Sequence, residues 1–104
     1  MNDAAFRASL GDPAPPARLS GALAALWWDT RGDWARAHAA AQADSSLAGA
    51  AVHAYLHRKE PDPANARYWY ARAGRKPAEG PSAAERDALL AELLATPTGK
   101  ETPT

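Results

Sequence analysis

The chain has almost none of the residues from which a β-sheet is usually built. Val52 is its only β-branched aliphatic residue and isoleucine is absent, whereas alanine and leucine contribute 28 and 10 of the 104 residues. Branched side chains favour the pleated surface of a strand, whereas Ala, Leu, Arg and Glu favour helix. Alanine buries little surface, so about 20 larger apolar residues must supply the core of one small domain. The sequence therefore predicts an all-α fold.

Prolines, glycines and capping residues divide the chain into short helical segments. Asp33 and Asp62 are expected to cap two equivalent helices, because an aspartate side chain accepts a hydrogen bond from a free amide of the first helical turn. Ser82 and Glu85 have the spacing of a capping box at the start of a leucine-rich helix. The pattern predicts helices between Asp3 and Gly11, over 17–31 and 34–43, from the Asp44–Ser46 segment to about Lys59, over 63–73, and from Ser82 onward.

Two of these helix pairs resemble each other at an offset of 29 residues. Asp33 and Ala37 align with Asp62 and Ala66, at the places where a capped second helix would begin and then touch the first. The alignment predicts two helical hairpins of the same kind. Their alanine-rich faces predict close packing between the helices.

The opening Gly32-Asp33-Trp34 followed by Ala37 resembles that of the second helix in tetratricopeptide-type helical repeats. The resemblance covers about residues 19–74, with a shorter period than the family has, and implies two stacked hairpins of a kind that mostly binds partners and rarely catalyses. The sequences HAYLHRKE at 53–60 and NARYWY at 65–70 also resemble a small, functionally uncharacterised group of bacterial proteins.

The domain layout follows from these segments. We expect an N-terminal arm with a short helix over residues 1–16, a single helical domain over 17–95 and a disordered tail over 96–104, where Thr, Pro, Gly and charged residues alternate. The last helix carries an apolar stripe and is expected to close the domain by packing against the second hairpin. The stripe consists of Leu89, Leu90, Leu93 and Leu94.

Charge and composition exclude several classes of function. Twelve basic and twelve acidic residues cancel, so no overall field attracts nucleic acid or an anionic membrane. Cysteine is absent, which excludes disulfides, thiolate nucleophiles and cysteine-ligated metals. No secretory signal or membrane span is recognisable in the sequence. We expect a cytoplasmic protein, either a monomer or a homodimer, without nucleic-acid or membrane partners.

Three histidines are the clearest candidates for chemistry. His53 and His57 lie four residues apart, a spacing that places two imidazoles on one face of a helix. His38 lies in the preceding hairpin, which a repeat stack would place alongside, and three imidazoles suit a divalent transition metal. The alternative is that His53 and His57 point inward, toward Tyr68 or Tyr70, as hydrogen-bonded and neutral core residues.

Carboxylates near these histidines are interpreted as structural. Asp33 is expected to serve as a cap, and Asp29 and Glu60 are expected to be exposed residues at helix ends. The alternative is that one of the three pairs with His57 or His38 as an orienting carboxylate.

The function that the sequence favours is a small helical-repeat binding or adaptor module without catalytic residues. Its partner would be a protein segment or a small ligand, held by the densest group of polar and aromatic residues, and no cofactor is expected. That group comprises His53, Tyr55, His57, Arg58, Tyr68 and Trp69. A metal-binding or catalytic pocket formed by His38, His53 and His57 is the alternative.

Overall fold

A computed structural model describes residues 1–95, which form six helices and no strand. The prediction of an all-α fold is confirmed. The predicted tail over 96–104 lies outside the described residues. The helices are α1 (Asp3–Ser9), α2 (Gly21–Thr30), α3 (Trp34–Ala43), α4 (Leu47–Lys59), α5 (Pro63–Ala73) and α6 (Ser82–Ala95).

Local capping signals set most of the helix ends. The side chain of Asp33 accepts a hydrogen bond from the amide of Arg36 at 3.0 Å, and that of Asp62 accepts one from Asn65 at 3.2 Å. Both predicted caps are therefore confirmed. Gly74 ends α5 in the left-handed conformation, with φ of 72°, which glycine adopts at little cost.

Two helix starts differ from the sequence-based prediction. Helix α2 begins at Gly21 rather than near residue 17, because Ser20 caps it by accepting a hydrogen bond from Leu23 at 3.2 Å. Helix α1 is capped by Asn2, whose side chain accepts from the amide of Ala5, and not by Asp3. In both cases a neighbouring polar residue provides the cap, so the segment is the predicted one with a shifted first turn.

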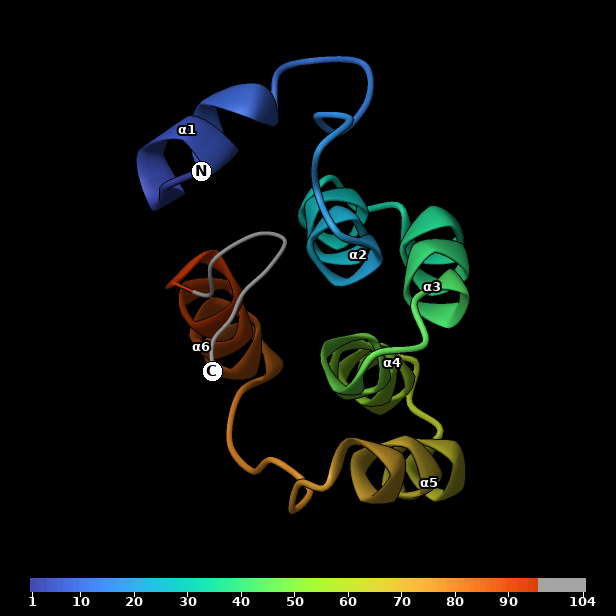
Figure 1. Ribbon diagram of the computed structural model, residues 1–104. Helices are drawn as coiled ribbons and strands as arrows, with labels where there is room; N and C mark the ends of the chain where they lie inside the picture. Colours follow the sequence, from blue (N-terminus) through green and yellow to red (C-terminus); the bar gives the residue numbers. More distant parts are fainter. Residues whose placement is uncertain (96–104) are drawn as a thin grey trace.

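The helices are arranged around α2 and α4. Consecutive helices from α2 to α5 pack against one another. Figure 1 shows α3 and α6 on opposite sides of α2 and α4, with α1 at the end of the molecule near α2. The side of α4 that faces away from α6 is therefore flanked by α3 and α5, and this is where the candidate site lies.

The position of α6 confirms one part of a prediction and corrects another. The helix packs against α4, so the expected contact with the second hairpin is present. It also packs against α2 and touches α1, so it covers the first helices of both hairpins and does not close the end of the second. Leu89 and Leu90 are buried, whereas Leu93 and Leu94 are half-buried. A stripe of leucines specifies that a face must be covered, but it does not specify by which helices.

The predicted capping box at Ser82 is also wrong. Ser82 is already the first residue of α6, and the amide of Glu85 bonds to the carbonyl oxygen of Pro81. The Glu85 carboxylate instead accepts hydrogen bonds from Arg58 at 2.9 Å and from the Tyr70 hydroxyl at 2.6 Å. Glu85 therefore bonds to side chains of α4 and α5 and not to the start of its own helix.

The core depends on a few large side chains among many alanines. Trp27, Tyr55, Phe6, Leu26, Leu56 and Val52 are its largest fully buried members. The indole Nε1–H of Trp27 donates to the Ser9 hydroxyl at 3.0 Å, which attaches α1 to α2.

Within the described part of the chain, no helix combines the length and the apolar character needed to span a bilayer.

Candidate metal centre

Helices α3 and α4 bring the three histidines into one cluster. His53 and His57 lie one turn apart on α4, and His38 reaches them from α3. One ligand nitrogen of each ring lies within 4.8 Å of those of the other two. His53 and His57 are 2% and 5% exposed, and His38 is half-buried. The cluster is therefore a buried group of imidazoles with one member near the surface.

The closest contact joins His38 and His53. Their Nε2 atoms are 2.9 Å apart, so without a metal one must donate a proton and the other must accept it. The Nδ1 atom of His53 is buried and has no hydrogen-bond partner in the described structure. A buried polar atom without a partner costs about 1–3 kcal/mol. The cluster thus contains a polar group that the protein itself does not satisfy.

Two tryptophans enclose the cluster. Trp34 stacks on His38, with ring centroids 4.9 Å apart, and meets His57 edge-on at 5.9 Å. Trp69 of α5 stacks on His53, with the centroids 3.9 Å apart and the planes inclined by 15°. The Trp34 indole is itself fixed by a 2.9 Å hydrogen bond to the carbonyl oxygen of Leu56. These contacts leave the imidazoles little freedom to rotate.

A carboxylate orients the third imidazole. Glu60, at the end of α4, lies 2.9 Å from Nδ1 of His57. This contact contradicts the expectation that Glu60 is only an exposed helix end, although its side chain is 43% exposed. It leaves Nε2 of His57 as the nitrogen that is available to a ligand. A carboxylate on the remote nitrogen of an imidazole is the usual outer-sphere partner of a metal-bound histidine.

Burial favours the neutral form of these imidazoles. It lowers the pKa of His53 to about 4, and the neighbouring charges of His38 and His57, when protonated, act in the same direction. Burial also lowers the pKa of His38, with a further contribution from His57. Neutral imidazole is the form that binds a metal. At neutral pH His38 and His53 are therefore already neutral and can bind a metal without first losing a proton.

The prediction that His53 and His57 point inward is confirmed, but their neighbours differ from those expected. His53 contacts Trp69 of α5, and His57 faces α3, whereas Tyr68 is 52% exposed. Tyr70 is turned toward Glu85 of α6. The apolar stripe of α5 takes Tyr70 into the core, so Trp69, one residue earlier, is the ring that reaches the histidines.

The other proposed binding residues lie in three different surroundings. Tyr55 is buried on the opposite side of α4, where its hydroxyl donates to Asp29 at 2.5 Å. Arg58 pairs with Glu85 and donates to the carbonyl oxygen of Gly80. Tyr68 is at the surface and accepts a hydrogen bond from Arg72. Of the group of six, only His53, His57 and Trp69 belong to the histidine cluster, and Tyr68 touches Trp69 with ring centroids 5.2 Å apart.

Asp29 is not the exposed helix end that the sequence predicts. It is 6% exposed and also accepts a hydrogen bond from Lys59 at 2.7 Å. Burial, together with the bond to Asp29, raises the pKa of Tyr55 above its usual range. This network joins α2 to α4 and does not contribute to the histidine cluster.

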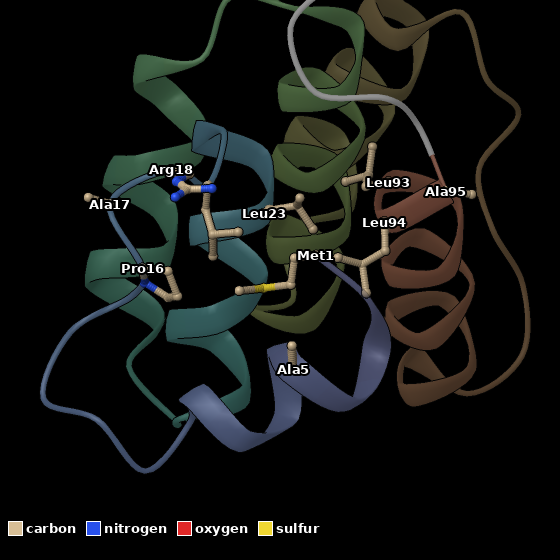
Figure 2. Close-up of a pocket in the computed structure, with 10 residues that line it drawn as sticks. Met1, Ala5, Pro16, Ala17, Arg18, Leu23, Leu93, Leu94 and Ala95 are labelled. Carbon is tan, nitrogen blue, oxygen red and sulfur yellow. The ribbon is translucent and has the colours of Figure 1, made fainter.

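A large cavity lies elsewhere and lacks the chemistry of a metal site in the part of its lining that the structure describes. It has a volume of about 720 Å³ and is formed by α1, the segment before α2, α2 itself and the end of α6 (Figure 2). Leu23, Leu93, Leu94 and Met1 contribute to its wall, and Arg18 is the one charged side chain among the lining residues that the structure describes. Neither a histidine nor a carboxylate is among these residues.

Sequence reasoning missed Trp34 as a neighbour of the histidines, and it gave Glu60 only as the less favoured alternative. Trp34 precedes His38 by four residues, and Glu60 follows His57 by three, spacings that place side chains on one helical face. That spacing was the available signal.

Comparisons with protein-family models, curated proteins and solved structures found no match to this chain.

Proposed function

We propose that the protein binds one divalent transition-metal ion through His38, His53 and His57. The observation that carries the proposal is the convergence of three imidazole nitrogens within 4.8 Å in a buried cluster. Nδ1 of His53 has no hydrogen-bond partner in the described structure, so the protein's own hydrogen bonds do not satisfy every nitrogen of this cluster.

The donor set fits zinc, copper or nickel. Imidazole nitrogen is a preferred ligand of these metals, at about 2.0–2.1 Å from zinc. Two such ligands on one tetrahedral ion lie slightly farther apart than the 2.9 Å between Nε2 of His38 and Nε2 of His53. If these two rings moved slightly apart, both Nε2 atoms could bind one metal ion in place of the proton that they share in its absence. Glu60 supports the same assignment by holding His57 with Nε2 free.

Metal analysis of protein purified without a polyhistidine tag tests the proposal. After equilibrium dialysis against zinc, we expect one zinc per chain. We expect this binding to be lost in His53→Ala and weakened by at least about tenfold in His38→Gln, which changes the more exposed ligand. Gln42→Ala is a matched control, because Gln42 lies on an exposed part of α3 one turn beyond His38.

Two further outcomes decide the result. Copper(II) should quench the fluorescence of the full-length protein, because Trp34 and Trp69 stack directly on two of the ligands. Equal zinc binding by His38→Gln, His53→Ala and the unchanged chain would place the ion elsewhere and refute the proposal.

A binding module of the tetratricopeptide type is the second proposal. The observation that favours it is the exposed Tyr68, 52% accessible, beside Arg72 and the half-buried Trp69 on α5. This surface offers an aromatic and cationic contact to a protein segment or a small ligand. The two proposals are separable, because Tyr68→Ala should leave zinc binding unchanged.

A further inference from the structure

The cavity of Figure 2 is a candidate binding site that neither proposed function uses. Its volume of about 720 Å³ lies within the range of about 300–1,000 Å³ that is typical of small-molecule sites. Two contacts outside the cavity fix its walls on the side of α1. Trp27 of α2 donates to Ser9, and the guanidinium of Arg31 donates to the carbonyl oxygen of Leu10 at 3.1 Å. The walls are therefore positioned by contacts that a ligand need not displace.

Aliphatic side chains form most of the described wall. Leu23 is buried, whereas Leu19, Leu93 and Leu94 are half-buried. Met1 adds a flexible thioether side chain that adapts to the shape of its neighbours. A hydrocarbon ligand would remove the exposed part of these leucines from water, which favours binding in proportion to the apolar area buried. No aromatic ring is among the described lining residues, so the wall suits a flexible alkyl chain better than a stacked planar group.

The charge at the cavity comes from one cation. Arg18 is exposed and is the single charged side chain in the described lining. Its guanidinium forms neither an ion pair nor a hydrogen bond with another described residue, whereas Arg7 on the nearby α1 pairs with Asp3 at 3.0 Å. A guanidinium binds a carboxylate through two parallel hydrogen bonds. An anionic group at the exposed edge of the cavity would therefore complement Arg18.

We infer that this cavity binds a saturated fatty acid of medium chain length, with its carboxylate on Arg18 and its alkyl chain among the leucines of the wall. The head group follows from charge complementarity with Arg18, and the unbranched chain follows from the aliphatic lining. The described lining shares no residue with the histidine cluster. The inference is thus independent of the proposed metal centre, and the two are tested separately.

Titration calorimetry of the full-length, metal-free protein with decanoate at pH 7 tests the inference. We expect one decanoate per chain, and an affinity that rises about fourfold per methylene from hexanoate to decanoate. Arg18→Gln should weaken decanoate binding about three- to fivefold, as expected for an exposed ion pair, and leave the binding of decanol unchanged. Arg67→Gln is the matched control, because Arg67 is exposed on α5 and lies outside the described lining.

Filling the cavity provides a second variant. Ala5 is exposed on α1 and lines the cavity (Figure 2), so Ala5→Phe should take up part of the volume without changing a buried residue. We expect it to lower decanoate affinity at least about tenfold, the effect of losing roughly two buried methylenes. Ala4→Phe is the control, because Ala4 is exposed on the same helix and is not among the described lining residues.

Four outcomes would overturn the inference. They are no binding of decanoate, equal binding by Ala5→Phe and Ala4→Phe, equal binding by Arg18→Gln and Arg67→Gln, and binding by a chain ending at Ala95 but not by the full-length chain. The last would assign the cavity to residues 96–104 of the chain itself. A full-length chain that elutes as a dimer and binds no decanoate would assign the surface to a second copy. Zinc binding is unaffected by any of these results.

Discussion

His53 combines the two properties that define the candidate site. It is almost completely buried between Trp69 and His38, and one of its nitrogens has no partner. The same burial that prepares the ring for a metal makes its protonation unfavourable. The loss of stability of the metal-free protein in acid therefore measures how strongly the surroundings of His53 disfavour its protonated form.

Acid should destabilise the metal-free protein through His53. The pKa of His53 is about 4 in the folded protein and about 6.5 in an unfolded chain. Between these values the unfolded state binds more protons, so the free energy of unfolding falls as the pH is lowered from 7 toward 4. At pH 5 this loss is about 2 kcal/mol, and His38, whose pKa is also lowered, adds to it.

Urea unfolding at pH 7 and pH 5, with a chelator present, measures this effect. The double variant His53→Gln, His57→Gln is the reference, because it keeps side chains of similar polarity that do not titrate. We expect it to lose less stability on acidification than the unchanged chain. Equal losses in the two proteins would mean that the imidazoles are as accessible to protons in the folded state as in the unfolded one.

Helix α6 shows how tertiary contacts override a local signal. Its first turn reads as a capping box, yet Glu85 connects Arg58 of α4 with Tyr70 of α5. The Glu85 side chain is 9% exposed and that of Arg58 is 22% exposed. Burial, together with the bond to Glu85, raises the pKa of Tyr70 above its usual range. The three residues thus form a largely buried polar connection between helices.

Removing Glu85 should therefore cost more than removing Ser82. Glu85→Ala removes the carboxylate that accepts from the Arg58 guanidinium and the Tyr70 hydroxyl, and breaking a buried pair costs up to about 3–5 kcal/mol. Ser82→Ala should change the free energy of unfolding by less than about 0.5 kcal/mol, because Ser82 is not the cap. Urea denaturation of both variants gives the comparison. Similar losses of about 1 kcal/mol in each would instead support the capping box.

How much of this structure the sequence predicts depends on how far apart in the sequence the interacting residues lie. Asp33, Asp62 and Gly74 act on their own helix ends, so the sequence located α3 and α5 well. The spacing of His53 and His57 likewise placed both rings on one face of α4. The partners of Asp29, Glu85 and Trp69 come from helices distant in sequence, and a pattern along one helix does not specify them.

At the scale of the whole molecule, α6 completes the core. It lies against α2 and α4, on the side away from α3 (Figure 1). The buried cluster there includes Leu23, Leu26 and Val52 together with Leu89 and Leu90. The histidine cluster lies on the other side of α4, so α6 supports it only through the position of that helix.

A chain ending at Pro81 should lose its cooperative fold, because the apolar faces of α2 and α4 would then be in water. Even Leu90→Ala, at a position 3% exposed, should cost about 2–5 kcal/mol, a large part of the 5–15 kcal/mol typical of a domain. Leu94→Ala should cost less, since Leu94 is half-buried beside the open cavity of Figure 2. Circular dichroism melting with size-exclusion chromatography compares the three chains. A monomeric truncated chain with unchanged melting would show that the leucines of α6 belong to an interface with another molecule.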